Sequence, residues 1–157
     1  MRTDNRNVKA TVISVYFVLI VLAVLLATVF QSLEIFVYSN LFLFVGCFVI
    51  MIIFHYLARH FEYDSDGDKI ILLNQGLILA DYLNYRKHRL EFSKEQLIGF
   101  KIKNFILYKS LVIVIKKQDG RVVKERFNVT LVKRKSLKYI RQSLNKTIKL
   151  NKKQKLA

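Results

Sequence analysis

The residues of this chain best suited to chemistry are basic side chains gathered near its C-terminus. The segment from 133 to 155 carries ten Lys and Arg residues and no acidic residue. Such side chains donate charge-assisted hydrogen bonds to phosphate and carboxylate groups, so the segment is suited to binding anions. We expect contact with an anionic surface through seven of them: Lys133, Arg134, Lys135, Lys138, Arg141, Lys146 and Lys149.

Three interpretations of this basic segment are open. It is a solvated helix face without a partner, a contact for the anionic head groups of membrane lipids, or a nucleic acid interface. Each basic residue near an anionic lipid surface contributes about 1 kcal/mol of binding. Nucleic acid is the least favoured partner, because Tyr139 is the only aromatic residue in the segment that could stack on a base.

No arrangement of residues predicts catalysis or a bound cofactor. The stretch from 62 to 157 has no cysteine and a single histidine, His88, which lies between Lys87 and Arg89 and is expected to be solvated. Nucleophilic catalysis needs a nucleophile, a base and a group that orients the base. We therefore predict a non-enzyme without catalytic, cofactor-binding or metal-binding residues.

Three aspartates at alternate positions, Asp64, Asp66 and Asp68, are spaced like the first ligands of a calcium-binding loop. An EF-hand loop has glycine at its sixth position and glutamate at its twelfth. Here Gly67 is fourth and Gln75 is twelfth. The interpretation that fits better is a hairpin turn whose backbone is held by aspartate side chains.

The elements that position these residues fall into an apolar part and a basic part. Residues 10–58 contain one charged residue, Glu34, whereas residues 62–157 hold 23 basic and nine acidic residues, a net charge of +14. Runs at 11–30 and 35–58 are apolar on all sides and uncharged, and each is long enough to span the hydrocarbon core of a bilayer, about 30 Å. We predict two transmembrane helices within a hairpin from 10 to 60.

Basic residues flank the predicted hairpin at its two ends and are absent from its connecting turn. Arg2, Arg6 and Lys9 precede the first helix, and Arg59 follows the second. The positive-inside rule then predicts a cytoplasmic tail at 1–9 and a multi-pass protein of the cell inner (plasma) membrane with both termini in the cytoplasm.

From Phe61 onward the pattern changes to that of short strands followed by one helix. Runs rich in β-branched and aromatic residues are expected to form strands at 61–64, 69–73, 77–85, 90–92, 97–103, 110–116 and 121–130. Asp119-Gly120 between the last two runs is typical of a tight hairpin. Apolar residues then recur at helical spacing at Leu137, Ile140, Leu144 and Ile148.

These elements predict an α+β fold class. A two-helix transmembrane hairpin is followed over 61–150 by an antiparallel β-barrel or sandwich. A C-terminal amphipathic helix caps this domain, and a basic tail follows at 151–157.

This arrangement resembles that of the bacterial pleckstrin-homology (PH)-like membrane proteins, small proteins with two helices before a PH-like domain. Residues 61–67, the Asp119-Gly120 hairpin and the helix from Lys133 to Lys149 carry the resemblance. It implies a binding platform. It brings no phosphoinositide site, because Lys69 stands alone among the acidic residues of the first hairpin.

The expected function is to present this basic module to anionic membrane lipids or to a protein partner. The alternative is a structural subunit that assembles through its apolar helices with another integral membrane protein or with copies of itself. No cofactor is expected in either case.

Overall fold

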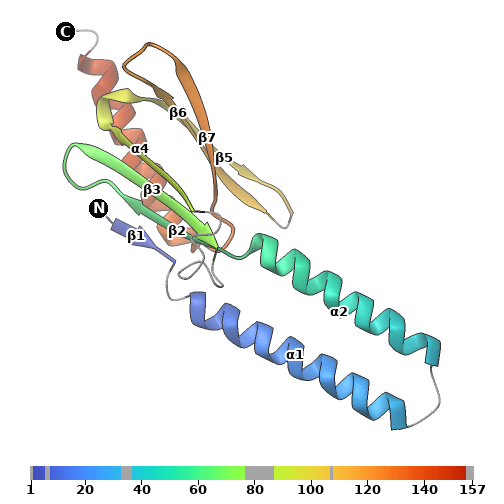
Figure 1. Cartoon of the computed structure of the whole chain (residues 1–157). Helices are drawn as coiled ribbons and strands as arrows, with labels where there is room; N and C mark the ends of the chain where they lie inside the picture. Colours follow the sequence, from blue (N-terminus) through green and yellow to red (C-terminus); the bar gives the residue numbers. More distant parts are fainter. Residues whose placement is uncertain (1, 6–7, 33–36, 77–86, 107, 155–157) are drawn as a thin grey trace. The chain divides into compact units, whose positions relative to one another are not determined.

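The chain forms two compact units in the computed structural model, one from Met1–Arg6 with Arg59–Ala157 and one from Asn7–Ala58. The residues that the structure describes are 2–5, 8–32, 37–76, 87–106 and 108–154. Figure 1 shows strands and a C-terminal helix in the larger unit and two helices in the smaller one.

Two antiparallel sheets make up most of the larger unit. Sheet A has the order β1-β2-β3-β4, with β1 at Arg2–Asp4, β2 at Arg59–Asp64, β3 at Lys69–Gly76 and β4 at His88–Ser93. Sheet B has the order β5-β6-β7, with β5 at Leu97–Asn104, β6 at Lys109–Lys116 and β7 at Val122–Asn128. The predicted strand at 77–85 lies outside the described residues.

Of the predicted barrel or sandwich, the barrel is wrong, because the strands that the structure describes form two separate ladders. A short 3-10 helix, η1 (Lys94–Gln96), lies between β4 and β5 and ends sheet A before sheet B begins. β4 therefore pairs with β3 while β5 pairs with β6. The correct description is α+β with two antiparallel sheets, and the described residues contain three α-helices.

Both predicted tight turns form as their residue types require. Gly67 and Gly120 adopt positive φ angles of 66° and 81°, a conformation that glycine tolerates without a steric penalty. Asp64 accepts a hydrogen bond at 2.9 Å from the backbone N–H of Asp66, and Asp119 accepts one at 3.0 Å from that of Arg121. Within the residues described, Asp64 thus holds the backbone of the first turn with its side chain, as predicted for the aspartates of this turn.

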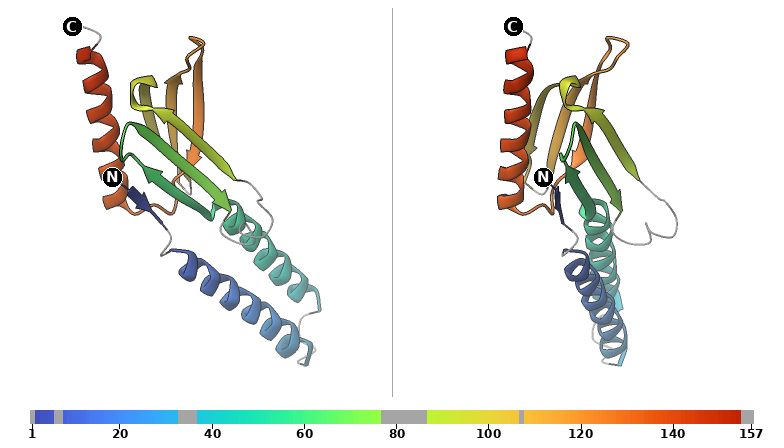
Figure 2. Two further views of the ribbon diagram at one scale, coloured as in Figure 1. Left: turned by 60° about the vertical axis from the view of Figure 1, so that its left-hand side comes forward. Right: turned by 90° about the vertical axis from the view of Figure 1, so that its left-hand side faces the viewer.

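A core between the sheets is closed by α4 (Arg134–Gln154), which Figure 2 shows along one side of the strands. Phe61 of β2 and Phe127 of β7 meet edge to face with ring centroids 6.4 Å apart. The buried side chain of Asn74 donates a hydrogen bond at 2.8 Å to the carbonyl oxygen of Asn128. An apolar contact and a satisfied polar contact therefore join sheet A to sheet B.

The N-terminal strand β1 was not predicted, because residues 1–9 were assigned to a tail. β1 pairs with β2, almost sixty residues later in the chain. Asn5 stabilises this junction: its side chain accepts a hydrogen bond from the Phe61 backbone N–H at 2.8 Å and donates one to the Arg59 carbonyl at 3.0 Å. A three-residue strand of this kind depends on its distant partner and has no local pattern of its own.

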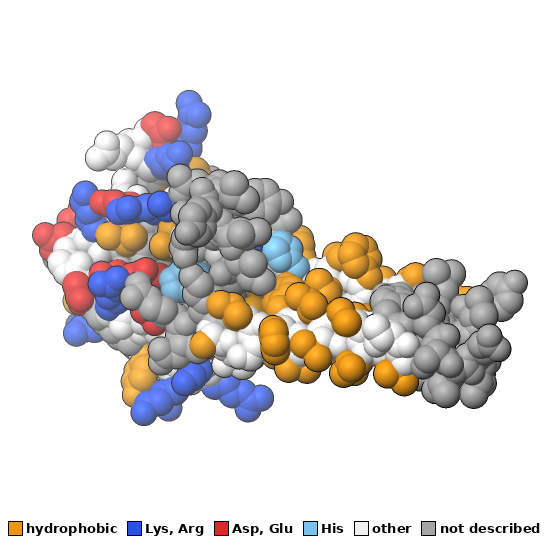
Figure 3. Space-filling model, turned by 60° about the horizontal axis from the view of Figure 1, so that its bottom comes forward, with side chains coloured by type: hydrophobic (Ala, Val, Ile, Leu, Met, Phe, Trp, Pro, Cys, Tyr) orange, Lys and Arg blue, Asp and Glu red, His pale blue; other side chains and the backbone are white. Residues whose placement is uncertain are grey.

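The smaller unit consists of α1 (Val8–Ser32) and α2 (Val37–Leu57), which pack on each other. Tyr16 and Phe54 meet edge to face at 5.8 Å between ring centroids. Many large apolar side chains of this pair are exposed, including Phe17, Phe42 and Phe48, and Figure 3 shows hydrophobic side chains gathered over its surface. These helices therefore leave much of their apolar surface unburied within the unit.

The predicted transmembrane hairpin is wrong. Over the residues that the structure describes, no helix combines the length and the apolar character needed to cross a membrane. A span requires about 20 consecutive, predominantly apolar residues, and the prediction took the apolar runs at 11–30 and 35–58 to be such spans. Two further predictions depended on these spans and are wrong as well. One was a multi-pass inner-membrane protein with both termini in the cytoplasm, and the other was that its helices are membrane helices that face lipid.

Candidate anionic-surface interface

The inner face of α4 fixes which residues of this helix reach the surface. Ile140 and Leu144 are fully buried in the core, and Leu137 and Ile148 pack against it at its margin. Their spacings of three and four residues place all four on one side of a helix. Burying this stripe leaves the other side of α4 for the basic residues.

Polar contacts hold the middle of α4 at a defined rotation. The Tyr63 hydroxyl donates a hydrogen bond to Ser143 Oγ at 3.0 Å, and Ser65 Oγ lies 3.1 Å from the same oxygen. Burial raises the pKa of the Tyr63 phenol above 10.0, and the hydrogen bonds with Ser143 and Ser65 oppose that shift only in part. Tyr63 therefore stays protonated and able to donate at neutral pH.

Asn151 holds the last turns of α4 against the corner between the sheets. Its side-chain nitrogen lies 2.7 Å from the Lys94 carbonyl oxygen and 3.0 Å from that of Leu97. The sequence placed Asn151 in a basic tail after the helix, but α4 continues to Gln154. The outer face is longer by about one turn as a result, and it gains Lys153.

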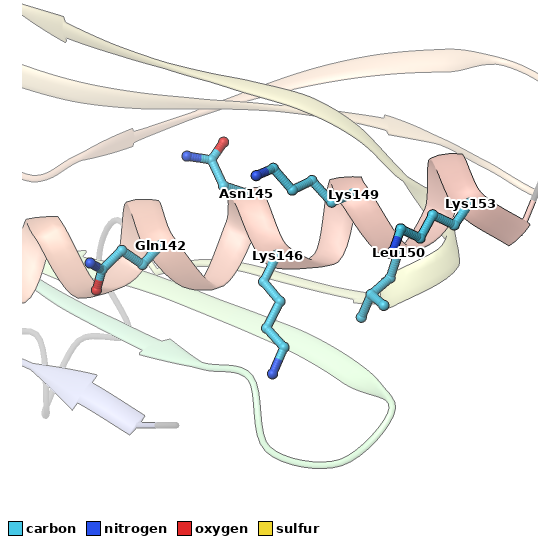
Figure 4. A pocket seen from close by; sticks show the side chains of 6 residues that line it. All are labelled: Gln142, Asn145, Lys146, Lys149, Leu150 and Lys153. Carbon is cyan, nitrogen blue, oxygen red and sulfur yellow. The ribbon is translucent and has the colours of Figure 1, made fainter.

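The outer face of α4 is a basic stripe with a shallow groove of about 420 Å³ along its C-terminal half. The groove is lined by Gln142, Asn145, Lys146, Lys149, Leu150 and Lys153, whose spacings of three and four residues place them on one side of the helix. Figure 4 shows Lys149 running along the helix toward Asn145, while Lys146 extends away from both of them. The two amines thus point apart rather than toward one bound ion.

The seven residues predicted to contact an anionic surface are all exposed. Lys146 and Lys149 line the groove, whereas Lys133 precedes the helix. Helical spacing places Lys135 and Lys138 on the same outer face, and Arg134 and Arg141 on its flank. Lys153 was missed, although its spacing of four from Lys149 and seven from Lys146 is a signal that the sequence contains.

The charge of α4 is not neutralised by ion pairs among the residues that the structure describes. Its eight Lys and Arg residues have no acidic residue on the same helix, and none of them forms a described ion pair. Acidic side chains of sheet A pair elsewhere: Glu62 with Arg2 at 2.7 Å, and Glu91 with Lys69 at 3.0 Å. The outer face therefore presents a field of one sign.

His88 differs from its prediction as a solvated side chain. Its ring stacks on that of Phe127 with centroids 4.7 Å apart, and Nε2 lies 3.1 Å from a carboxylate oxygen of Glu125. This places a β4 side chain against β7, so the contact joins the two sheets. In the described ranges of the chain, no three His, Cys, Asp or Glu side chains group as metal ligands would.

No family model, curated protein or solved structure matches this chain. The resemblance to the bacterial PH-like proteins therefore stays a prediction.

Proposed function

We propose that the larger unit binds anionic lipid head groups through the outer face of α4, as a contact at the lipid–water boundary. The observation that carries this proposal is the row of basic side chains without described ion pairs along α4. A helix of 21 residues is roughly 30 Å long, so the row extends over several head groups. At about 1 kcal/mol for each basic residue near the surface, such a row supplies several kcal/mol of binding free energy.

The arrangement of the amines favours an extended surface over a compact ligand. A single bound phosphate is held by groups that converge on it, whereas the amines of Lys146 and Lys149 diverge from one another. An array of head groups can contact each amine separately. The outer face is therefore better suited to an extended anionic surface than to one small anion.

Two exposed apolar side chains on α4 favour lipid over nucleic acid. Tyr139 is 41% exposed and Leu150 is 53% exposed, and helical spacing places both beside Lys146. Helices that lie at a lipid surface combine basic residues with apolar side chains that enter the head-group boundary. Nucleic acid interfaces without sequence preference use several aromatic side chains for stacking, and α4 has one.

The test compares vesicles of phosphatidylcholine alone with vesicles that also contain phosphatidylserine. Full-length protein should float with the anionic vesicles more strongly than with the neutral ones. The triple substitution Lys138→Ala, Lys146→Ala and Lys149→Ala should weaken the anionic-vesicle affinity by roughly 100-fold, since three contributions of about 1 kcal/mol are removed. Affinity for neutral vesicles should not change.

A matched control removes the same charge from the end of sheet B that carries the β6–β7 turn. Lys116, Lys117 and Lys124 are exposed and belong to the β6–β7 hairpin instead of α4, so their replacement by alanine should leave the preference for anionic vesicles intact. An equal loss of anionic-vesicle affinity in both triple variants would show that binding depends on net charge and not on α4. Undiminished binding by the α4 variant would overturn it.

A second candidate function is assembly through α1 and α2, favoured by their exposed apolar surface. Phe42 is 77% exposed and Phe17 is 68% exposed, and apolar patches of this kind mark contact surfaces. The partner would be a second copy of the chain or another protein with a complementary apolar face. Crosslinking in the native cell should recover one stoichiometric partner, and recovery of none would contradict this candidate.

A further inference from the structure

The loop that joins β5 to β6 exposes apolar side chains at the tip of a hairpin. Ile106 is fully exposed at 102% of its reference area, and the neighbouring Phe105 is 58% exposed. A single exposed apolar residue is common on protein surfaces, but two adjacent ones at the end of a hairpin concentrate apolar area at one projecting point. Figure 1 shows this hairpin projecting from sheet B.

Phe105 and Tyr108, on either side of the tip, contact each other through backbone and ring. The Phe105 N–H donates a hydrogen bond at 2.8 Å to the Tyr108 carbonyl oxygen, which closes the turn. The rings of Phe105 and Tyr108 stack with centroids 6.2 Å apart. Ile106 therefore lies next to a residue, Phe105, that a hydrogen bond and a ring contact join to Tyr108.

Basic residues flank the tip on both strands. Lys101 and Lys103 lie on β5, and Lys109 begins β6 opposite Asn104. None of the three forms an ion pair within the described part of the chain. An apolar point with a rim of amines matches the layered chemistry of an anionic lipid surface, in which acyl chains lie beneath acidic head groups.

We propose that Phe105 and Ile106 insert into the outer part of an anionic lipid layer, while Lys101, Lys103 and Lys109 contact its head groups. This inference depends on the lipid contact proposed for α4 and adds to it a second, apolar contact. The two have different physical signatures. The α4 contact weakens with salt, because it is electrostatic, whereas insertion of apolar side chains persists.

The chain contains no tryptophan, so one introduced at the tip reports on its own surroundings. Ile106→Trp in the full-length protein should shift its fluorescence to shorter wavelength when phosphatidylserine-containing vesicles are added, and brominated acyl chains should quench it. The matched control is Val122→Trp. Val122 is 57% exposed at the start of β7, near the turn at the other end of sheet B, and the emission of this variant should not change.

A loss-of-function variant provides an independent measurement. Ile106→Ser should weaken binding to anionic vesicles by about tenfold, because burial of one apolar side chain is lost. Val122→Ser should have no effect. Because Ile106 makes no core contact, circular dichroism and the unfolding midpoint should match those of the unsubstituted protein.

The outcomes separate this inference from the proposed function. If the Ile106→Trp protein binds anionic vesicles while its fluorescence neither shifts nor is quenched, the insertion is refuted and the α4 contact stands. If the Ile106→Trp and Val122→Trp proteins respond equally, the response is not specific to the tip, which also refutes the insertion. If the protein shows no preference for anionic vesicles, the proposed function itself falls.

Discussion

The inner and outer faces of α4 follow different rules although they share one helix. On the inner face, apolar side chains are buried and polar side chains have partners, as Ser143 and Asn151 show. On the outer face, Lys146, Lys149 and Lys153 follow one another at spacings of three and four without an acidic neighbour. The same contrast separates α4 from sheet A, where the hydrogen bond from Lys69 lowers the pKa of Glu91.

This contrast indicates that the outer face does not serve the stability of the fold. Like charges three or four residues apart on a helix destabilise it by a few tenths of a kcal/mol per pair. Lys146 and Lys149 form one such pair, and Lys149 and Lys153 another. Acidic residues on this face would relieve the repulsion, so their absence is more easily understood as a requirement of binding.

The largest difference between the faces should appear in Leu144→Ala. Leu144 is fully buried, so truncation leaves a cavity and should lower the free energy of unfolding by about 2–5 kcal/mol. Lys146→Ala, two residues away on the outer face, should change it by less than about 0.5 kcal/mol. Denaturant unfolding measures both. Similar losses in the two variants would contradict the assignment of the faces.

A smaller effect should come from Tyr63→Phe and should depend on pH. Because the Tyr63 pKa is raised in the folded chain, its contribution to stability is fully present below the unfolded value of 10.0 and is lost as pH rises through the folded value. Removal of the hydroxyl should cost about 1 kcal/mol at neutral pH, through loss of the Ser143 hydrogen bond. The stability difference between the two proteins should therefore narrow above pH 10.0. A constant difference across this range would show that Tyr63 does not titrate with unfolding.

The parts of the fold that follow from local pattern were predictable. The spacing of Leu137, Ile140, Leu144 and Ile148 identified the buried side of α4, because burial on a helix follows its period. Asp119-Gly120 located a turn, because few residues other than glycine adopt the positive φ found at Gly120. The exposure of all seven predicted contact residues followed from the position of the apolar stripe.

The parts that depend on distant residues were not predictable in the same way. β1 exists because Arg2–Asp4 pairs with β2, and no property of three residues shows that. The sequence left a barrel and a sandwich open, and the structure has two separate sheets, because strand patterns specify pairs of neighbours and not closure. The sequence shows Phe105 and Ile106 near lysines, but only the structure shows that both are exposed at a hairpin.

The smallest effect gives the sharpest test, because it should move stability and binding in opposite directions. Asn145 lies on the outer face with Arg141 four residues before it and Lys149 four residues after it. Asn145→Glu should form an i,i+4 pair with Lys149 and raise the free energy of unfolding by about 0.3–0.5 kcal/mol. The same carboxylate opposes anionic head groups and offsets one neighbouring cation, so affinity for phosphatidylserine-containing vesicles should fall by roughly tenfold. Asn145→Gln introduces a side chain of the shape of glutamate without its charge, and it should change neither the free energy of unfolding nor the vesicle affinity. If Asn145→Glu were both more stable and a tighter binder of these vesicles, the proposed electrostatic attraction between the outer face of α4 and lipid would be contradicted.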